Sequence, residues 1–537
     1  MRELPYRAVN IAHLLTKTAL RLPDEVAVIS GETRWTWREL DNAVSCLAHS
    51  LHQRGVGVGD CVMIHSTNHI EYVQSMFAVW RAGAVLAPTN VRLTPADVVG
   101  MARTCEPVLL LCHRDFPEFA AAVAADRNLE GGVLWLGADR PDADSVAAQC
   151  EGSHVRDAPV NVGDPAWYFF TSGTSGAPKC AVLTHDHMGF VVNNHLCDLM
   201  PGTMWWDRSL VTAPLSHGAG VHLLPQVAAG AATVLTGSPN LDGTEVWELV
   251  ERERVSNMFT VPTILKILAE HPDARTRDLS SLRYVVYAGA PMASVDQRHA
   301  RDVLGDVLVQ YYGLGEVTGN ITVLPPQLHD HPRPTGVEIG TCGYPRTGMQ
   351  VSIQDSDGTE LAPGQTGEIC VSGPAVFEGY FNNDAANAAA FRNGWFCTGD
   401  LGQLDDHGFL YVTGRASDMY ISGGSNIHPR DIEEKLLEHP GISEVAVLGM
   451  PDPKWGEVGV AVCVPLAGSS FDAQDLRAWL EPRLARYKIP RHFLIWEELP
   501  KSGYGKVVKR TIREHLGASN WSPAVATVSS TLGPRWR

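Results

Sequence analysis

The first third of this chain alternates short apolar runs with longer segments in which apolar residues recur at helical spacing. The helical segments are 37–51, whose start carries Thr36 and Glu39 at capping-box spacing, and 72–81. The strand candidates are the apolar runs 62–64, 85–87, 108–111 and 133–136. Strands that alternate with helices need crossover connections and therefore build parallel sheets. The alternation continues to about residue 325 and predicts an α/β fold.

Two later changes in character divide the chain. From 351 to 413, short β segments are separated by turn sequences such as Asp357-Gly358 and His407-Gly408. After residue 414, a helix at 429–437, strands at 445–448 and 460–464 and a helix at 476–484 predict a smaller α+β unit. We therefore predict domains at 1–416 and 417–516. The tail 517–537 is rich in Ser, Gly and Pro, which predicts disorder.

Composition argues against several classes of protein. The net charge of −17, from 43 basic and 60 acidic residues, argues against a nucleic-acid partner. No uncharged apolar run approaches the roughly 18 residues that span a bilayer, and the first residues lack a signal-peptide pattern. The 11 cysteines include no Cys-x-x-Cys pair, which favours free thiols in a reducing compartment. We expect a cytoplasmic protein without a membrane span.

The clearest local motif is a loop of glycine and hydroxyl residues that follows an aromatic strand and ends in Pro178-Lys179. Glycines let backbone N–H groups turn toward an anion, hydroxyls add donors, and the lysine adds positive charge. The candidate phosphate-binding residues are Thr171, Ser172, Gly173, Thr174, Ser175, Gly176 and Lys179. The proline before the lysine distinguishes the loop from the usual mononucleotide-binding loop. Taken alone, the segment is also compatible with a flexible turn.

Four further segments carry candidate ligands for a nucleotide. The segment 311–316 offers the ring of Tyr312 for stacking on a base and the carboxylate of Glu316 for Mg²⁺. Asp400 ends a loop suited to the two hydroxyls of a ribose. The segment 414–433 joins the two predicted domains, and Lys506 lies on a glycine-flexed loop. Each segment alone has an ordinary structural interpretation, so their order along one chain carries the argument.

In that order, the five segments resemble those of the adenylate-forming enzymes, which include acyl-coenzyme A synthetases, peptide-synthetase adenylation domains and beetle luciferases. The resemblance covers roughly residues 10–515. It implies a large N-terminal domain with two α/β sheet subdomains and a β-barrel-like subdomain, followed by a small mobile α+β domain. It also implies an AMP-forming acid–thiol ligase with ATP, Mg²⁺ and coenzyme A as cofactors and a carboxylic acid as substrate.

The resemblance assigns roles on the nucleotide side of the site. The loop 171–179 is implied to bind the ATP phosphates, and Glu316 is implied to bind Mg²⁺. Asp400 and Arg415 resemble the ribose contacts. The remaining candidates around the nucleotide are Gly289, Ala290 and Pro291, which resemble the segment packed on adenine, and Tyr311, Tyr312, Gly313 and Gly315.

Further roles concern the acyl and thiol chemistry. Lys506 resembles the lysine that bridges the substrate carboxylate and the α-phosphate during adenylation. His217 resembles the gate beside the acyl pocket. Gly423 and Gly424 resemble the lining of the pantetheine tunnel, which forms when the small domain rotates about a hinge near Ser417. The implied catalytic residues are Lys506, Glu316 and His217.

The main departure from the family pattern is Gly315, which stands where the family usually has a threonine whose hydroxyl contacts the α-phosphate. A hydrogen bond to a charged group contributes roughly 1.5–3 kcal/mol, so its loss slows adenylation by about 10- to 100-fold if the bond strengthens in the transition state. This suggests, as an alternative, an enzyme that only forms the thioester from acyl-adenylate made elsewhere. Smaller departures occur at Ser175, Cys180, Gln310, Ser417 and Asp431.

The gate segment indicates an uncharged acid, because 214–224 contains no acidic residue to pair with an ammonium group. Gly218, Ala219 and Gly220 either leave room for a bulky acyl chain or reflect tight packing, and Trp205 and Trp206 suit either an apolar pocket or the core. Aliphatic, aromatic and polycyclic acids stay open.

We expect free coenzyme A as the acceptor and a separate carrier protein as the second choice, since no carrier domain is expected after residue 515. A non-catalytic binding protein and a luciferase-like oxidase also stay open at this point. The same holds for assembly into a homodimer.

Overall fold

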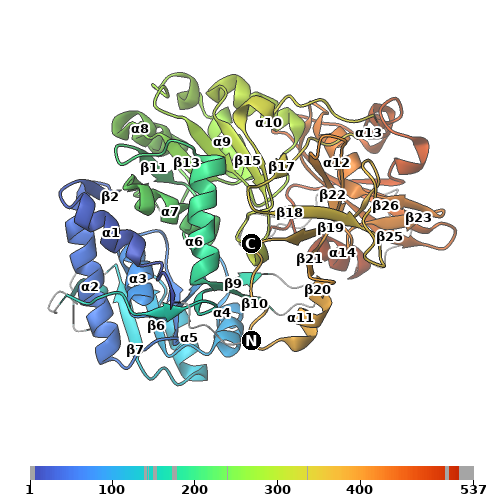
Figure 1. Ribbon diagram of the computed structural model, residues 1–537. Coiled ribbons are helices and arrows are strands. Elements are labelled where there is room, and N and C mark those ends of the chain that lie inside the picture. Colours follow the sequence, from blue (N-terminus) through green and yellow to red (C-terminus); the bar gives the residue numbers. More distant parts are fainter. Residues whose placement is uncertain are drawn as a thin grey trace.

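The computed structural model describes residues 7–137, 142, 144–148, 154–171, 178–238, 240–335, 337–501 and 507–518. Three larger sheets and the helices packed on them form the chain as far as residue 415, and a fourth sheet follows (Figure 1). In that view the first sheet lies at the lower left, the second lies above it, and the last lies at the right. The predicted α/β class is confirmed.

The first sheet has six strands in the order β10-β9-β5-β4-β6-β7. They are β4 (Cys61–His65), β5 (Val85–Thr89), β6 (Leu109–His113), β7 (Gly132–Leu136), β9 (Pro165–Thr171) and β10 (Lys179–Thr184). Neighbours run parallel except β9 and β10, which form an antiparallel pair. The four strands expected between 62 and 136 are therefore present. A separate small sheet pairs β1 (Arg7–Ala8) with β8 (Val160–Asn161).

The second sheet has nine strands in the order β17-β16-β15-β14-β13-β11-β12-β2-β3. They are β2 (Val26–Ser30), β3 (Thr33–Thr36), β11 (Arg208–Val211), β12 (Ala232–Leu235), β13 (Asn257–Thr260), β14 (Tyr284–Tyr287), β15 (Leu308–Tyr312), β16 (Thr322–Leu324) and β17 (Tyr344–Pro345). The six central strands are parallel, and antiparallel strands close both edges. The carboxyl ends of β13, β14 and β15 therefore meet at one edge, where ligands commonly bind in such sheets.

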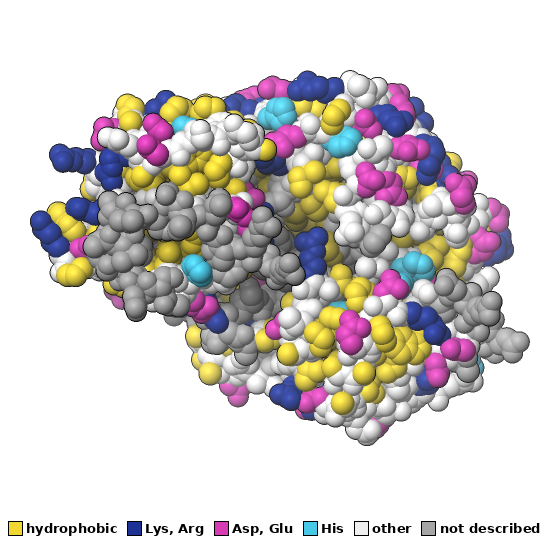
Figure 2. Space-filling model, turned by 180° about the vertical axis from the view of Figure 1, so that it is seen from behind, with side chains coloured by type: hydrophobic (Ala, Val, Ile, Leu, Met, Phe, Trp, Pro, Cys, Tyr) yellow, Lys and Arg dark blue, Asp and Glu magenta, His cyan; other side chains and the backbone are white. Residues whose placement is uncertain are grey.

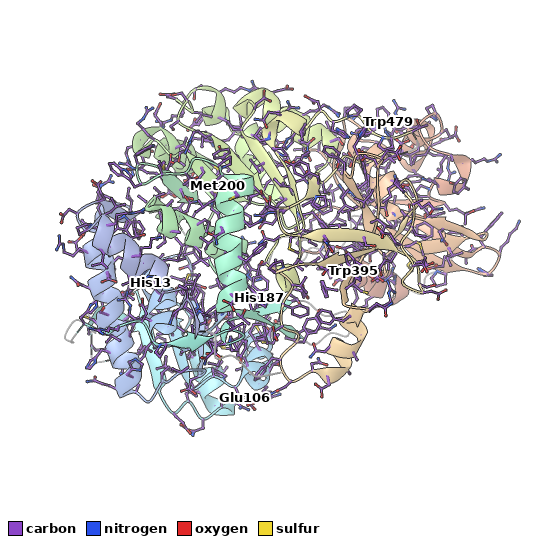
Figure 3. The ribbon with its side chains drawn as sticks, viewed as in Figure 1. His13, Glu106, His187, Met200, Trp395 and Trp479 are labelled. Carbon is purple, nitrogen blue, oxygen red and sulfur yellow. The ribbon has the colours of Figure 1, made fainter. Side chains whose placement is uncertain are left out.

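The helices of these two layers are α1 (His13–Arg21), α2 (Trp37–Gln53), α3 (Ile70–Arg81), α4 (Pro95–Cys105), α5 (Pro117–Asp126), α6 (His185–Asn194), α7 (Gly218–Ala229), α8 (Gly243–Glu253), α9 (Pro262–Glu270) and α10 (Ser294–Leu304). α2 begins with a complete capping box, as its sequence predicts. Every residue of α3 is buried, including Arg81, which pairs with Asp41 and Asp157. α6 continues into η2 (His195–Leu199), and Figure 3 places His187 and Met200 toward opposite ends of this helical column.

The β-rich segment expected after 351 forms an antiparallel sheet in the order β18-β19-β21-β20, with β22 paired to β21. Its strands are β18 (Gln350–Gln354), β19 (Gly367–Ser372), β20 (Phe391–Arg392), β21 (Trp395–Leu404) and β22 (Leu410–Arg415), and α11 (Asp384–Ala390) precedes β20. β21 is the longest of these strands. It carries Asp400, which therefore lies within a strand and not in the loop expected from the sequence.

The last part of the chain has its own sheet, in the order β24-β23-β26-β25, with β27 paired to β26. The elements are β23 (Tyr420–Ser422), β24 (Ser425–Ile427), α12 (Pro429–Leu437), β25 (Ile442–Asp452), β26 (Gly456–Pro465), α13 (Ala473–Leu480), β27 (His492–Ile495) and α14 (Lys509–Ala518). Two apolar clusters here draw their members from 420–516 alone, so this part has a core of its own. The predicted boundary at 416/417 falls between β22 and β23 and stays a prediction. Of the predicted tail, 519–537 lie outside the described residues.

Charged and apolar side chains are interspersed over the face seen in Figure 2. Trp205 and Trp206, for which the sequence allows a pocket or the core, are 43% and 61% exposed and pack on each other. Within the described ranges, no helix is both long enough and apolar enough to cross a bilayer.

Candidate active site

The predicted phosphate-binding loop connects two antiparallel strands. β9 ends at Thr171 and β10 begins at Lys179, and these two residues are register partners. The loop therefore leaves and rejoins the sheet at one place. Five of its candidates, Ser172, Gly173, Thr174, Ser175 and Gly176, lie outside the described residues, and their roles stay predictions.

Glu316 is the centre of a buried hydrogen-bonded cluster beside this loop. It lies in η4 (Gly315–Val317), a short helical turn after β15, and is 6% exposed. Its Oε1 accepts hydrogen bonds from the hydroxyl of Thr171 at 3.0 Å and from the hydroxyl of Tyr380 at 2.9 Å. Lys179 Nζ lies 4.8 Å from the centroid of the Tyr380 ring. Thr171 and Tyr380 thus meet at Glu316, and Lys179, at the other end of the loop, lies over Tyr380.

Tyr380 is a site residue that the sequence did not single out. It lies beyond β19 in an irregular segment that bridges to Ala181 of β10, so only the folded chain brings it to Glu316. Burial, together with the nearby Glu316 carboxylate, raises the pKa of the Tyr380 hydroxyl. The hydroxyl therefore stays protonated and donates its hydrogen bond. An aromatic residue after a Glu-Gly pair is too common a pattern to reveal this role.

The Glu316 carboxylate has the chemistry of a divalent-cation ligand. The two hydroxyls that bind it are neutral, and no cationic side chain of the described residues forms an ion pair with it. A buried carboxylate without a countercharge is costly. Because Mg²⁺ prefers carboxylate oxygens together with phosphate oxygens, Glu316 fits the ligand role implied for it.

A second polar cluster surrounds Asp400. Tyr312, the last residue of β15, donates a hydrogen bond from its hydroxyl to Asp400 Oδ2 at 2.7 Å. Arg415 Nε lies 3.0 Å from Asp400 Oδ1, and the two residues are register partners in β21 and β22. Burial and the charge of Asp400 raise the pKa of the Tyr312 hydroxyl, which keeps it a donor. The structure therefore brings Tyr312, Asp400 and Arg415 together, as their predicted roles require.

The predicted adenine segment lies next to this cluster in the sheet. Gly289, Ala290 and Pro291 follow β14, whose neighbour is β15. Gly289 has a φ of +88°, which lies in the left-handed region that favours glycine. Tyr311 points away from the cluster: it is 7% exposed and stacks on Phe259 with ring centroids 6.0 Å apart. Of the two adjacent tyrosines, Tyr312 is the one that reaches Asp400.

The predicted gate residue His217 lies at the N-terminus of α7. Its ring meets the ring of Phe169 edge-on, with centroids 4.8 Å apart. The glycines that follow are tightly packed: a Cβ on Gly218 would lie 2.5 Å from the ring of Phe259, and one on Gly220 would lie 2.0 Å from a backbone oxygen. Of the two interpretations left open by the sequence, tight packing is therefore correct for these glycines.

α12 carries the described contacts between the last part of the chain and the N-terminal part around α10. Glu434 Oε1 accepts a hydrogen bond from the backbone N of Ser294 at 2.8 Å, and Lys435 pairs with Glu338 at 2.8 Å. These contacts fix α12 against the segment that follows β14.

The remaining candidates of this part lie apart from the two clusters. Ser417 is exposed in the turn between β22 and β23. Gly423 and Gly424 form the turn between β23 and β24 and have φ values of +58° and +83°. No contact among the described residues joins either glycine to Glu316 or Asp400. Lys506 lies outside the described residues, so its role stays a prediction.

A cluster of possible metal ligands lies elsewhere in the β-rich sheet. The ligand atoms of Glu368, Cys370 and Cys397 lie within 4.8 Å of one another. The guanidinium of Arg392 is 3.2 Å from Glu368 Oε2 and 3.5 Å from Cys370 Sγ, so it already supplies positive charge. Burial raises the pKa of the Cys370 thiol to about 12. Since metals bind the thiolate, this cluster does not favour a metal.

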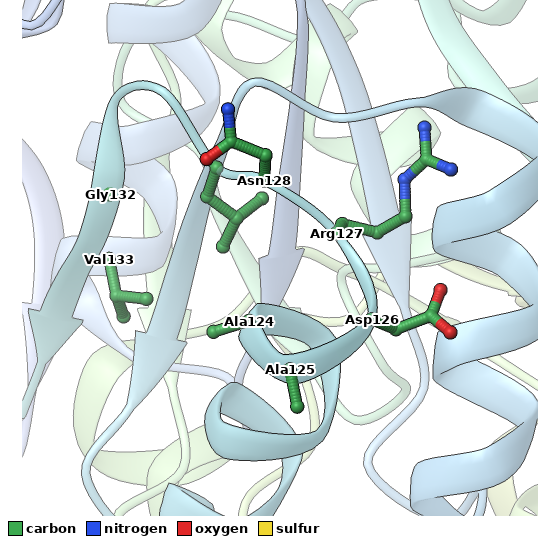
Figure 4. A pocket seen from close by; sticks show the side chains of 8 residues that line it. Ala124, Ala125, Asp126, Arg127, Asn128, Gly132 and Val133 are labelled. Carbon is green, nitrogen blue, oxygen red and sulfur yellow. The ribbon is translucent and has the colours of Figure 1, made fainter.

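Figure 4 shows a surface hollow of about 470 Å³ at the end of α5. It is lined by Ala124, Ala125, Asp126, Arg127, Asn128, Leu129, Gly132 and Val133. The last two residues start β7, which lies at the opposite edge of the first sheet from β9 and β10. The hollow is therefore separate from the Glu316 and Asp400 clusters.

Two family models cover most of the chain. The AMP-binding enzyme model matches residues 15–381, and the model of the AMP-binding enzyme C-terminal domain matches residues 431–506. The chain belongs to the AMP-binding enzyme family. The resemblance inferred from its motifs is thereby confirmed.

Individual relatives match nearly the whole chain. A feruloyl-CoA synthase from an Amycolatopsis species is 37% identical over 500 residues, which cover 92% of this chain and 96% of the relative. The amide bond synthetase McbA from Marinactinospora thermotolerans has a TM-score of 0.84 at 28% identity, covering 94% of this chain and all of that one. The o-succinylbenzoate CoA synthetase of Bacillus subtilis, in complex with its acyl-adenylate intermediate, has a TM-score of 0.82 at 29% identity, covering 96% and 99%.

Proposed function

We propose that the protein is an AMP-forming acid–thiol ligase, which activates a carboxylic acid with ATP and transfers the acyl group to coenzyme A. The observation that carries the proposal is the convergence of distant segments at the Glu316 carboxylate, which Thr171 and Tyr380 bind while Lys179 lies over the Tyr380 ring. Similarity to a CoA ligase over 92% of the chain supports the same reaction.

On the nucleotide side, each cluster has a task. Lys179 and the loop that it ends bind the phosphates. Asp400, held by Tyr312 and Arg415, accepts hydrogen bonds from the two ribose hydroxyls. The ring of Tyr312 packs on adenine opposite the 289–291 segment. Because Asp400 is buried and already oriented at both oxygens, it is preorganised for a diol.

The first half-reaction brings two anions together, the carboxylate of the acid and the α-phosphate. Groups that neutralise charge as it develops lower this barrier. Lys506 bridges the two anions, while Thr171 and Tyr380 hold the Glu316 carboxylate in place as a cation ligand. Mg²⁺ held by Glu316 would supply positive charge next to the phosphate oxygens and so polarise them.

The second half-reaction needs Lys506 to leave so that a thiol can reach the acyl carbon. We infer that the domain 417–516 rotates about Ser417 and brings Gly423 and Gly424 toward the site. The rotation breaks the described α12 contacts, which are the Glu434 hydrogen bond, the Lys435–Glu338 pair and the hydrogen bond from Arg430 to the carbonyl of Met292. Each of these contacts is polar, so water can replace the lost partner once the two surfaces separate.

We infer an uncharged aliphatic, aromatic or polycyclic acid as substrate, free coenzyme A as acceptor and a cytoplasmic location. A carrier protein is the second acceptor, and an amine is a third because of the similarity to McbA. A thioester-only enzyme and a non-catalytic protein are not favoured, since the CoA ligase relatives are named for the complete reaction.

The test is an acid panel with ATP, Mg²⁺ and coenzyme A, in which AMP and acyl-CoA are followed by mass spectrometry. Lys506→Ala is expected to lower acyl-adenylate formation by about 100-fold or more while sparing thioester formation from synthetic acyl-adenylate. Lys501→Ala is the matched control, because this lysine pairs with Glu444 at 2.8 Å nearby. The absence of both acyl-AMP and acyl-CoA with every acid, from folded protein, would overturn the proposal.

A further inference from the structure

Gly315 is glycine because of space rather than backbone conformation. It is not among the described glycines with a positive φ, so its backbone is open to other residues. A Cβ at this position would lie 2.5 and 2.6 Å from Cδ1 and Cε1 of Phe169 and 3.0 Å from Cγ2 of Thr171. Two carbon atoms make favourable contact at about 3.5–4.0 Å, so these distances are clashes. The ring of Phe169 already fills the volume that a side chain at 315 would take.

Phe169 also reaches the other side of the site. It precedes Thr171 by two residues in β9, so both side chains point to the same face of the sheet. Its ring meets His217 edge-on at 4.8 Å and lies 6.3 Å from the ring of Trp167. The half-buried ring of Phe169 therefore extends from Gly315, beside Glu316, to His217 at the N-terminus of α7.

We propose that Phe169 and Gly315 form one size-matched unit and that Phe169 is a specificity-determining residue for the acid substrate. The ring replaces the missing side chain at 315 as the wall between the phosphates and the acyl group, and its edge contact positions His217. This inference rests on the proposed ligase function.

The ring of Phe169 also bears on the absence of a threonine hydroxyl at 315. The ring excludes water from the place where the carboxylate meets the α-phosphate. Charge interactions strengthen as the local dielectric constant falls, so the attraction of Lys179 and of a cation at Glu316 for the phosphate charge increases. The chain thus needs no hydroxyl at 315 to complete the first half-reaction.

The first experiment tests the size match with Gly315→Ala, Phe169→Leu and the double variant, assayed for acyl-CoA formation. The added Cβ is expected to lower kcat/KM for ATP by about tenfold or more, and Phe169→Leu, which leaves the KM for ATP nearly unchanged, is expected to restore most of that loss. Gly313→Ala is the matched control. Its Cβ would meet the backbone of Gly319 at 2.3–2.5 Å, so Phe169→Leu cannot relieve the clash.

The second experiment tests specificity. Phe169→Leu is expected to raise the KM for the acid by about fivefold or more and to leave the KM for ATP within about twofold, because only the acyl side loses its wall. Phe169→Tyr keeps the ring and is expected to keep the KM for the acid. A purely structural role for Phe169 would instead lower stability without separating the two KM values.

Losses that multiply in the Phe169→Leu/Gly315→Ala variant, or equal changes in both KM values, would overturn the inference. The size match has a second readout in thermal unfolding: Gly315→Ala lowers the melting temperature, and the double variant restores it. If the wild-type protein made no product from any acid, the proposed function would fail, whereas restored melting would still support the paired packing.

Discussion

Tyr380→Phe tests whether the Glu316 carboxylate is held for a cation. The substitution removes one hydroxyl that donates to Glu316 Oε1 at 2.9 Å and keeps the ring beneath Lys179. The hydroxyl of Thr171, at 3.0 Å, is then the donor left to Glu316 among the described side chains. The change is therefore confined to one hydrogen bond to a buried charge.

The size of the effect follows from the charge of the acceptor. A hydrogen bond to a charged group contributes about 1.5–3 kcal/mol, and the full value applies when the group is left short of a partner. Glu316 is 6% exposed, so water does not readily replace the hydroxyl. We expect the free energy of unfolding to fall by about 1.5–3 kcal/mol in buffer without Mg²⁺ and ATP.

Binding of Mg²⁺ and ATP is expected to reduce this deficit, because a cation on Glu316 supplies the countercharge that the hydroxyl partly provided. The assay is chemical denaturation of both proteins with and without Mg²⁺ and ATP. Tyr487→Phe, at a site that is 56% exposed, is the control and is expected to change stability by less than about 0.5 kcal/mol. A deficit that is equally large in the presence of Mg²⁺ and ATP would refute the argument.

Three further predictions follow from the structure. Asp400→Ala is expected to raise the KM for ATP by about tenfold or more and leave the KM for the acid nearly unchanged, in steady-state kinetics. Burial lowers the pKa of His222 from 6.5 to about 4. The contribution of the neutral ring to stability is therefore complete above pH 6.5 and is lost as the pH falls toward 4. In urea unfolding measured at a series of pH values, His222→Gln is expected to reduce the fall in the free energy of unfolding between pH 6.5 and 4. Asp157→Ala leaves the buried Arg81 one carboxylate short and is expected to destabilise by about 3 kcal/mol, against less than about 1 kcal/mol for exposed Asp24→Ala.

Each of the three has an outcome that contradicts it. Equal changes in both KM values for Asp400→Ala would exclude a ribose contact. An unchanged loss of stability between pH 6.5 and 4 in His222→Gln would mean that His222 does not contribute to it. If Asp157→Ala and Asp24→Ala lowered the free energy of unfolding equally, the burial of Arg81 would not determine the size of the loss.

Much of the architecture was predictable because local patterns match the final environment. The apolar runs 62–64, 85–87, 108–111 and 133–136 became β4 to β7, and the first three of these strands are buried along nearly their whole length. The capping box that starts α2 depends only on residues three apart. Short motifs likewise predict Glu316, Tyr312 and Asp400 as candidates, and the structure places each of them in a polar cluster.

Other assignments required the folded chain. Tyr380 and Glu316 are 64 residues apart, so no local pattern connects their hydrogen bond. Trp205 and Trp206 are residue types that suit a pocket or the core, yet both are exposed. Exposure depends on which surfaces the rest of the chain covers. The small residues Gly218 and Gly220 suggest free space for an acyl chain, yet side chains and backbone from other residues fill that space.

The sequence by itself determined the fold class, the family and the nucleotide-side candidates, because these depend on periodicity and on residue types at short spacing. Only the tertiary structure decided what Gly315 means. In the sequence it is a missing hydroxyl and suggests a weakened enzyme. In the folded chain it is the space into which the ring of Phe169 fits, and that fit depends on atoms that are 146 residues apart in the chain and in close contact in the structure.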